Sequence, residues 1–494
     1  MRFEVKGLQQ EQTQPKTILR RLAGVLLIGY LAAVVLFYFL AGEQLHLRES
    51  RGNIDLLPAE SGTMELTAGC TVEQQFTTKI QRLEQVSVQW GTYYRQNSGT
   101  ALIELWDLQN NRLLLSQTFD AAAISEGGLT TLTAEEPIEG LYLVPLSLRI
   151  ASLDSQPGSA PSPLMNLQPQ TEEAGGSQQL LLNGKPASGT LCFTVRGTDY
   201  IWTGLHYWEF AAAGFVLLIL LLATIWYRSQ KEKRSYVINA VIAVQKYRFL
   251  IRQLVARDFK IKYKRSVLGM FWSFLNPLLM MCVQYFVFST IFMNDIPNYA
   301  VYLLIGVVVF NFFSEACGMA LGSIVGNAGL ITKVYMPKYI YPLTRVMSSV
   351  INLGISLIPL LIVSLATGVR FHKSAILSFY FFICVIIFSL GLGLFLSAAM
   401  VFFRDVQFLW GVLSMIWMYA TPIFYPETIL PDNFKIILQV NPLYHFLKNA
   451  RICILDGISP EPIVYIQCML IALAVLVVGA IVFRKSQDRF VLYL

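Results

Sequence analysis

The residues most suited to chemistry in this 494-residue sequence are a group of cations between positions 245 and 265. They are Arg252, Arg257, Lys260, Lys262, Lys264 and Arg265, with Tyr263 among them. Apolar residues of the same segment can share one side of a helix. These apolar residues are Phe249, Leu250, Leu254, Ala256 and Phe259. We expect a helix lying flat on the cytoplasmic membrane surface, where basic side chains bind the phosphates of anionic lipids. By itself, such a helix could be only an anchor.

Catalytic and metal-binding patterns are missing from the sequence. A nucleotide-binding loop reads GxxxxGK[ST], because its amides and lysine hold phosphates, and the nearest run, Gly184-Lys185-Pro186, lacks the upstream glycine and the Ser/Thr. Neither a DxD pair nor a CxxC pair occurs, and the four histidines are scattered. We therefore expect no catalytic residue, no metal ligand and no cofactor in this chain.

The composition places the chain in a membrane. Hydrophobic residues make up 55% and charged ones 14%, and the mean hydropathy of +0.53 is too high for a soluble protein. A helix needs about 20 apolar residues to cross the ~30 Å hydrocarbon layer, and eight such runs occur. Two flank a polar insert and six crowd the C-terminal half: Leu22–Leu40, Phe210–Tyr227, Leu268–Phe292, Val301–Gly322, Leu343–Thr367, Ala375–Phe403, Phe408–Phe424 and Ile463–Phe483.

Positive charges set the expected orientation. Lys and Arg gather before the first run, after the second and after the last, which makes both termini cytoplasmic. The first run starts too late for a cleaved signal peptide, so we interpret it as an anchor. The predicted organisation is a cytoplasmic N-terminus (1–21), a membrane helix (22–41), an extracytoplasmic domain (42–206), a membrane helix (207–228), a cytoplasmic linker with the surface helix (229–265) and a domain of six membrane helices (266–494).

The segment expected outside alternates apolar and polar residues over short runs, which predicts an antiparallel β-sandwich. The runs are 86–90, 101–106, 141–144 and 191–195. Pro, Ser, Gly and Gln dominate 154–179, which indicates a disordered loop. The sequence permits a disulfide between Cys70 and Cys192, which lie near the first and last strands, and equally permits them to stay unpaired.

The residues after the basic segment carry a family resemblance. The run from Tyr263 to Pro277, YKRSVLGMFWSFLNP, resembles the opening of ABC-2 exporter permeases that move O-antigen, capsule or teichoic acid chains. The matching positions are Tyr263, Ser266, Leu268, Gly269, Trp272 and Pro277. Further landmarks at 310–315, 327–337, 402–406, 421–426 and 441–443 follow in the family's order. The resemblance covers about half of the chain, from Val244 to Leu494.

The resemblance implies the ABC-2 fold of six transmembrane helices, here preceded by two more that bracket the jelly-roll-like β domain. It also implies a homodimeric permease with two copies of a separate ATPase subunit, which would hold ATP and magnesium. The cytoplasmic residues expected to couple to that subunit are Leu330, Ile331, Lys333, Met336, Pro337, Arg404 and Asp405. Arg404 and Asp405 could instead be an ordinary solvated turn.

By the same resemblance, the cargo is a lipid-diphosphate-linked polysaccharide, and the basic helix lies at its entrance, where cations suit a diphosphate. Aromatic faces stack on sugars, and a buried acid in a membrane usually faces a wet path. The candidates for the path are therefore Tyr302, Phe310, Phe313, Glu315, Trp410, Trp417 and Tyr419. The aromatic residues could instead form lipid-facing belts, and Glu315 could be only a helix-end carboxylate.

The outer domain loosely resembles carbohydrate-binding jelly rolls, and we hypothesise that Trp90, Tyr93, Tyr94 and Trp106 contact the emerging glycan. A spacer or a docking module is the alternative. For the whole chain, the runner-up is an ABC-2 exporter of lipids or drugs. Alternatives of another class are a membrane glycosyltransferase, which would need an acidic catalytic site, and a receptor, which would not need six clustered spans. The net charge of +7 reflects the membrane orientation and gives no reason to expect nucleic acid.

Overall fold

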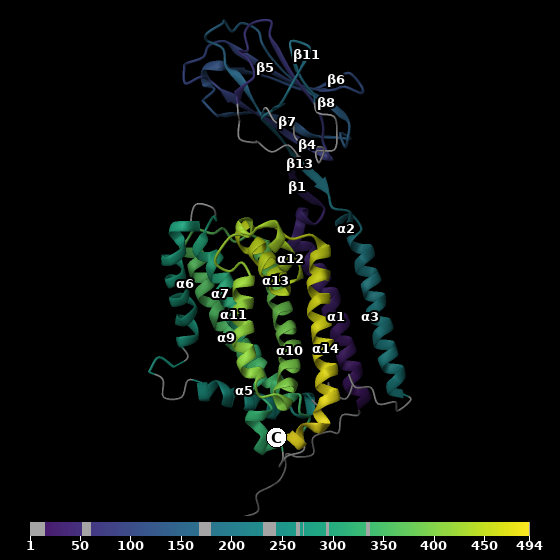
Figure 1. Cartoon of the computed structure of the whole chain (residues 1–494). Helices are drawn as coiled ribbons and strands as arrows, with labels where there is room; N and C mark the ends of the chain where they lie inside the picture. Colours follow the sequence, from purple (N-terminus) through teal and green to yellow (C-terminus); the bar gives the residue numbers. More distant parts are fainter. Residues whose placement is uncertain are drawn as a thin grey trace, which may run out of the picture. The chain divides into compact units, whose positions relative to one another are not determined.

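A computed structural model describes residues 15–51, 61–166, 179–230, 244–262, 267–269, 271–292, 296–331 and 336–493. Five of the positions singled out above lie outside the described residues: Tyr263, Lys264, Arg265, Ser266 and Lys333. The chain divides into two compact units, shown in Figure 1: a helical unit, Met1–Leu45 with His206–Leu494, and a β unit, His46–Leu205.

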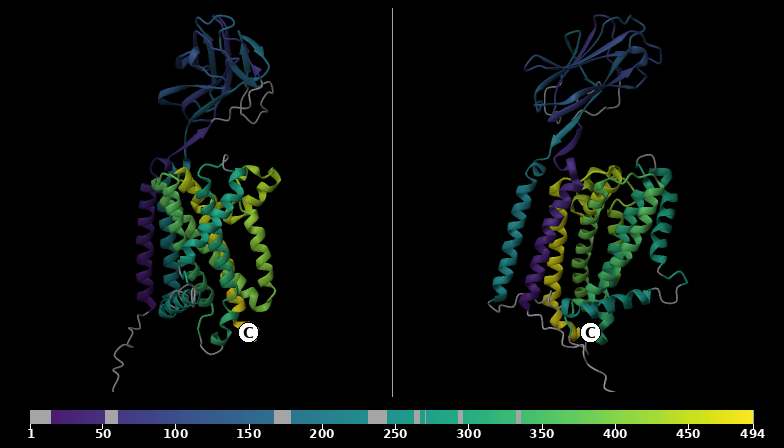
Figure 2. Two further views of the ribbon diagram at one scale, coloured as in Figure 1. Left: turned by 90° about the vertical axis from the view of Figure 1, so that its left-hand side faces the viewer. Right: turned by 180° about the vertical axis from the view of Figure 1, so that it is seen from behind.

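Long apolar helices run side by side through the helical unit (Figures 1 and 2). Among the described residues, seven helical stretches have the length and composition of a membrane span. They contain α1 (Pro15–Ala41), α3 (Tyr207–Gln230), α6 (Phe271–Phe292), α7 (Tyr299–Leu321), α9 (Ile340–Ala366), α10 (Ser378–Phe402) and α14 (Pro462–Ser486).

One predicted span is shorter than expected. The run 408–424 forms α11 (Val406–Ala420), whose 15 residues extend only about 22 Å. The helix ends at Thr421, which has extended backbone, because the following proline disfavours the helical conformation of the residue before it. The chain then turns through Pro422 and Pro426 instead of continuing to Phe424.

Shorter helices lie at the two ends of the bundle. The helix α5 (Arg248–Lys262) runs across one end, roughly perpendicular to the long helices (Figure 2). The helices α12 (Asp432–Val440) and α13 (Pro442–Arg451) lie at the opposite end (Figure 1). Among its described residues, this unit also has the short helices α8 (Ala328–Ile331) and α15 (Phe490–Tyr493).

Glycines allow α10 and α14 to pack with their backbones in contact. A Cβ added to Gly391 of α10 would lie 2.5 Å from Cα of Leu476 in α14, and one on Gly479 would overlap the Gly391 carbonyl. Lipid tails are as apolar as leucine, so helices in a membrane gain stability from close packing of small residues rather than from the hydrophobic effect. This pair therefore ties the last long helix to the centre of the bundle.

Two antiparallel sheets form the β unit. The first has the strand order β1-β13-β4-β9-β12, with β2 on β9 and β7 on β4, and the second has the order β11-β10-β3-β8-β5-β6. The strands are β1 (Leu47–Arg51), β2 (Ser61–Gly62), β3 (Thr71–Thr77), β4 (Arg82–Gly91), β5 (Thr100–Asp107), β6 (Arg112–Asp120), β7 (Leu129–Glu139), β8 (Pro145–Ser152), β9 (Ser162–Asn166), β10 (Gln179–Leu182), β11 (Lys185–Ala187), β12 (Thr190–Leu191) and β13 (Phe193–Tyr200). The short helix α2 (Trp202–Leu205) ends the unit.

Side chains from both sheets meet in one core, as a sandwich requires. Alternate residues of β3 and β5 are buried, and the rings of Phe76 and Phe193, one from each sheet, lie 4.9 Å apart.

Two predictions about the β unit were wrong. Residues 141–144 form a turn with Leu143 at φ 58°, and part of the predicted disordered loop forms β9, because its backbone pairs with β2, β4 and β12.

The predicted glycan-contacting residues separate into two groups. Trp90 is fully buried and donates from Nε1 to Thr130 Oγ1 at 2.7 Å, so its ring belongs to the core. Trp106 is half-buried, donates to Glu104 at 2.9 Å and lies under Arg149. Tyr93 and Tyr94 are exposed.

The structure does not join Cys70 to Cys192. Cys70 leads into β3 of one sheet, and its Sγ shares a hydrogen bond with Thr67 Oγ1 at 3.2 Å. Cys192 lies between β12 and β13 of the other sheet, where its buried backbone N–H donates to the Leu164 carbonyl.

The glycine contact predicts a stability difference between two conservative substitutions. We expect Gly391→Ala to destabilise the protein by about 1–3 kcal/mol, because its new methyl group must displace the backbone of α14. Gly354→Ala in α9 is the matched control, since a Cβ there meets nothing within 4 Å. Thermal unfolding of both variants in detergent checks this. Equal melting temperatures would contradict the proposed backbone contact.

Candidate functional site

The basic helix predicted from the sequence is present as α5. The side of α5 that packs against the bundle differs from the apolar side predicted for it. Leu254 is buried beside Ile340 at the start of α9, whereas Phe249 is 71% exposed and Ala256 is exposed. The prediction that these apolar residues share one side was wrong. Phe249 and Leu254 are five positions apart, which places them about 140° apart around a helix.

Asp258 fastens α5 to the bundle. Its side chain is only 2% exposed, and its two oxygens lie 3.1 Å from Arg257 Nη2 and 3.2 Å from Arg345 Nη1 of α9. Arg257 also donates to Asn327 Oδ1 at 3.4 Å. A buried carboxylate is stable only with such partners. Sequence analysis missed Asp258 and Arg345, although Asp258 is the one acid in a strongly basic segment.

At the end of α5, Lys262 reaches the spanning helices. Its Nζ lies 2.8 Å from Glu315 Oε1 of α7, and the same oxygen accepts a hydrogen bond from Asn352 Nδ2 of α9 at 2.6 Å. Ser273 of α6 donates to Asn352 Oδ1 at 3.1 Å. These polar contacts connect α5, α6, α7 and α9 around one carboxylate.

A cavity of about 240 Å³, here called the polar groove, surrounds these contacts. Its lining combines one ion pair with amides, hydroxyls and a few apolar side chains: Lys262, Trp272, Ser273, Asn276, Pro277, Val308, Asn311, Phe312, Glu315, Ser349, Asn352, Leu353 and Ser356. Sequence analysis found Lys262, Trp272, Pro277 and Glu315 but missed the amides and hydroxyls. A signal existed, because Ser349, Asn352 and Ser356 recur at helical spacing on one side of α9.

Pro277 leaves a backbone carbonyl of α6 without its helical hydrogen bond. A proline inside a helix has no N–H for the carbonyl four residues earlier, which here is that of Ser273. Ser356 Oγ of α9 donates to this carbonyl at 3.2 Å. The proline thus exposes a backbone acceptor between α6 and α9, and a neighbouring hydroxyl satisfies it.

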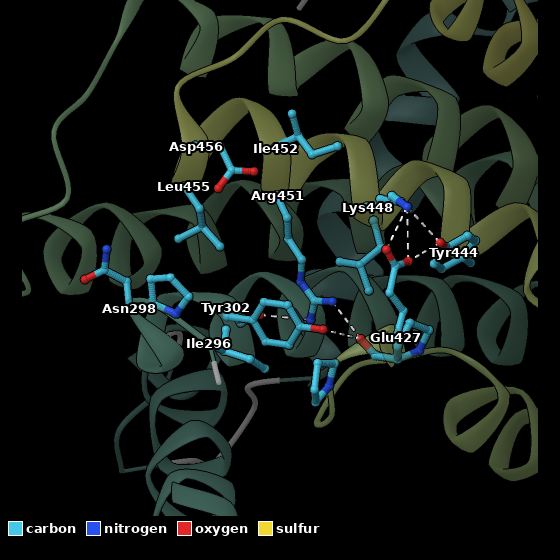
Figure 3. Close-up of a pocket in the computed structure, with 14 residues that line it drawn as sticks. Ile296, Asn298, Tyr302, Glu427, Tyr444, Lys448, Arg451, Ile452, Leu455 and Asp456 are labelled. Carbon is cyan, nitrogen blue, oxygen red and sulfur yellow. Dashed lines mark hydrogen bonds and ion pairs between the residues drawn. The ribbon is translucent and has the colours of Figure 1, made fainter. Parts of the chain in front are cut away.

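A second cavity, of about 250 Å³, lies at the opposite end of the bundle from α5. Arg451 of α13 is buried there, with its guanidinium carbon 3.4 Å from the centre of the Tyr302 ring (Figure 3). It donates to the carbonyls of Pro422 at 2.6 Å and of Tyr302 and Ile423 at 3.0 Å. Arg451 therefore holds the turn after α11 against the start of α7.

Beside Arg451, Glu427 accepts hydrogen bonds from Tyr444 Oη and from Lys448 Nζ, the latter at 2.9 Å (Figure 3). Partial burial by itself disfavours the charged carboxylate. The hydrogen bonds from Tyr444 and Lys448 outweigh it and hold the pKa of Glu427 below its ordinary value. Glu427 is thus an anion at neutral pH and clamps the segment before α12 to α13.

Known proteins are similar in sequence to the half of the chain that contains both cavities. The family model of the ABC-2 type transporter matches residues 250–455. The O-antigen export system permease protein RfbA of Klebsiella pneumoniae is 31% identical over 244 residues, which are 49% of this chain and 93% of that protein. The chain belongs to the ABC-2 transporter family.

Two other relatives of this ABC-2 permease match the same half of the chain. The RfbA permease of Myxococcus xanthus is 27% identical over 255 residues, 51% of this chain and 98% of that protein. The polysialic acid transport protein KpsM of Escherichia coli is 23% identical over 246 residues, 48% of this chain and 93% of that protein. The resemblance predicted from the sequence is confirmed, and the chain is a multi-pass membrane transport subunit.

The described signature residues of the ABC-2 permease cluster at the start of α6. Gly269 has φ 52°, a left-handed conformation that favours glycine, and its carbonyl accepts from the Trp272 N–H at 3.3 Å. Trp272 and Pro277 then line the polar groove, while Leu268 accepts from the Phe271 N–H at 3.0 Å. The signature therefore builds the turn into α6 and one wall of the groove.

The predicted coupling residues of the permease fall into two environments. Ile331 and Met336 are buried in the same cluster as Leu254 of α5, and Leu330 packs against this cluster. Pro337 is half-buried, and Arg404 and Asp405 are exposed in the turn between α10 and α11. Ile331 and Met336, the described residues on either side of 332–335, thus share a cluster with α5.

Most of the predicted path aromatics are structural in this permease. Phe310 and Trp410 are 8% exposed and Phe313 is fully buried, with the ring of Trp417 5.1 Å from that of Phe313. These rings lie in the apolar core of the bundle and do not line the polar groove, and their assignment to a path stays a prediction. Tyr302 donates to the Tyr425 carbonyl at 2.9 Å. Of the remaining candidates, Glu315 lies in the groove and Tyr419 is 60% exposed.

Removing the carboxylate of Asp258 should loosen α5. We expect Asp258→Ala to destabilise the permease by about 2–3 kcal/mol, less than for a wholly buried pair, because Arg257 and Arg345 remain 43% and 25% exposed. Lys260→Ala, on an exposed position of the same helix, is the control. Thermal melting in detergent measures both, and an unchanged melting temperature for Asp258→Ala would exclude this anchor.

Acid should release the Glu427 clamp. Because the folded-state pKa of Glu427 is depressed, its stabilisation is complete above the reference pKa of 4.5 and is lost as the pH falls through the folded-state value. The difference in melting temperature between the natural protein and Glu427→Gln should therefore be constant from pH 7 to about pH 5 and shrink below that. A difference that grows toward acid pH would refute the clamp.

Proposed function

We propose that this chain is the membrane subunit of an ATP-driven exporter that moves a lipid-diphosphate-linked polysaccharide out across the cytoplasmic membrane, and that the polar groove is part of the cargo's path. The observation that carries the proposal is a carboxylate, several amides and several hydroxyls gathered inside an apolar bundle, next to a basic surface helix. Relatives named as O-antigen export permeases and as a polysialic acid transport protein share this half of the chain.

The groove suits a hydroxyl-rich cargo. Asn276, Asn311 and Asn352 supply amides that can donate and accept, and the serines supply hydroxyls, so a sugar can exchange its water for these groups. Lys262 stands at the groove with its ammonium on Glu315, a position from which it can also bind a phosphate oxygen. An exporter of lipids or drugs, the runner-up, would gain little from such a lining.

Force from an ATPase can reach the groove through α5. The sequence has no phosphate-binding loop, so we expect a separate ATP-binding subunit, in two copies, on a homodimer of this permease. Ile331 and Met336, which belong to the loop expected to couple to the ATPase, pack in one cluster with Leu254 of α5, and α5 ends at Lys262. A push on that loop would therefore shift Lys262 relative to Glu315. In this proposal, the N-terminus is cytoplasmic and the β unit extracytoplasmic.

Substitutions in the groove test the proposal. We expect Glu315→Gln and Asn352→Ala each to lower export roughly tenfold or more, because each removes a hydrogen bond to a charged group worth about 1.5–3 kcal/mol. Export is measured as surface polysaccharide in cells that lack the natural gene and carry each variant at equal membrane abundance. Thr224→Ala in α3 is the control, since Thr224 bonds only within its own helix turn.

Two results would refute the proposal. Full export by both groove variants would remove the groove from the path. Export by the purified permease in liposomes without an ATP-binding subunit would remove the ATP-driven mechanism itself.

A further inference from the structure

The loop between β4 and β5 carries two exposed tyrosines on strained backbone. Tyr93 and Tyr94 are 51% and 92% exposed, and their φ angles are 57° and 56°. A bulky residue in the left-handed region costs about 1–3 kcal/mol, and such residues persist only where their surroundings enforce them. Two in succession therefore indicate a loop held in one shape.

Glu126, from the loop before β7, holds this backbone. Its Oε2 accepts from the Thr92 N–H at 2.6 Å, from Thr92 Oγ1 at 2.8 Å and from the Tyr94 N–H at 3.3 Å. The Thr92 hydroxyl, followed by backbone N–H groups, lowers the pKa of Glu126, so the clamp is charged at neutral pH. The carboxylate fixes the turn on which both rings stand.

Arg95 fixes the other side of the loop. Its Nη2 lies 2.5 Å from Glu65 Oε1 and donates to the Ala160 carbonyl at 3.1 Å, and its guanidinium carbon lies 5.0 Å from the centre of the Tyr93 ring. Glu65 in turn accepts from the Gly158 N–H at 2.8 Å. Segments from three parts of the β unit thus position two rings that contribute little to its core.

We propose that Tyr93 and Tyr94 form a carbohydrate-binding platform that stacks on pyranose rings of the exported polysaccharide. The choice of that polysaccharide as ligand rests on the proposed function. The loop itself favours a sugar, whose ring has one apolar C–H face and a hydroxyl-bearing edge. An aromatic face, with its negative quadrupole, complements the C–H face, and the exposed polar residues Gln96 and Ser98 follow in the same loop to meet hydroxyls.

A protein partner fits this surface less well. A stable protein interface buries about 800 Å² on each partner around an apolar centre. Here, two rings are followed within five residues by Arg95, Gln96 and Ser98, so the apolar area is small and its rim is polar. This combination matches the size of one or two sugar rings. The rigid backbone lowers the entropy cost of binding.

Binding to the full-length protein in nanodiscs tests the platform. The probe is the polysaccharide released by mild acid from the envelope of the source organism, immobilised on a biosensor. We expect Tyr93→Ala/Tyr94→Ala to weaken binding at least roughly tenfold, because it removes both stacking faces. Tyr142→Ala is the matched control, since Tyr142 is a 54% exposed tyrosine of the same unit, and it should bind like the natural protein.

A second variant tests whether binding needs the fixed backbone of the loop as well as the two tyrosine rings. Glu126→Gln keeps both tyrosines but replaces the charged acceptor that fixes their backbone, so it should weaken binding less than the double variant does. Unchanged melting temperatures of the variants would show that the β unit stays folded, and thermal melting is measured for each.

Two outcomes would overturn the platform. One is equal binding by the natural protein and the double variant, or no binding by either in a complex that exports normally. The other is a tyrosine-dependent complex with an envelope protein in place of polysaccharide. These outcomes are separate from failure of the proposed function, because groove variants that export normally would refute the path while leaving tyrosine-dependent binding intact.

Discussion

A carboxylate among apolar helices needs partners, and this requirement connects four helices of the helical unit. Glu315 is a half-buried residue of α7, a helix whose buried residues are almost all apolar, and its described hydrogen bonds go to other helices. Lys262 of α5 and Asn352 of α9 supply the charge and the hydrogen bond that stabilise it. The carboxylate thereby fixes the end of the surface helix against two spanning helices.

Other charged side chains of the bundle also have specific partners on neighbouring elements. Asp258 joins α5 to α9 through Arg345, and Arg451 joins α13 to the segment after α11 through backbone carbonyls. In an apolar surrounding, each of these groups is costly to leave unpaired, so each acts as a specific contact where apolar packing alone would tolerate sliding. Close to the groove, the ring of Phe313 packs against those of Phe388 and Trp417 in the apolar core.

This arrangement has a consequence for transport. In the proposed function, a polar cargo in the groove would be surrounded by the apolar core of the bundle, so its passage would require helices to move apart. In the same proposal, the movement begins at α5, because Leu254 of α5 packs in one cluster with Ile331 and Met336, and Lys262 of α5 lines the groove. The β unit has its own core and a loop strained at two tyrosines.

The amino-acid sequence alone determined the membrane class, the positions of most long helices, the β-rich insert and the family. These features rest on local patterns: long apolar runs, period-two alternation and the signature around Trp272 and Pro277. Local patterns can be recognised without knowledge of the fold. The sequence also singled out Lys262 as a member of a basic segment and Glu315 as an acid in an apolar run, and both features can be recognised from neighbouring residues.

Only the tertiary structure decided which of these residues meet. Asn352 and Ser273 became groove residues because α6 and α9 are neighbours, and Phe313 and Trp90 became core residues because other elements cover them. Side chains that look alike in the sequence, such as Trp90 and Tyr94, thus have opposite roles. The physical reason is that burial and pairing depend on contacts between distant segments, which spacing along the chain does not record.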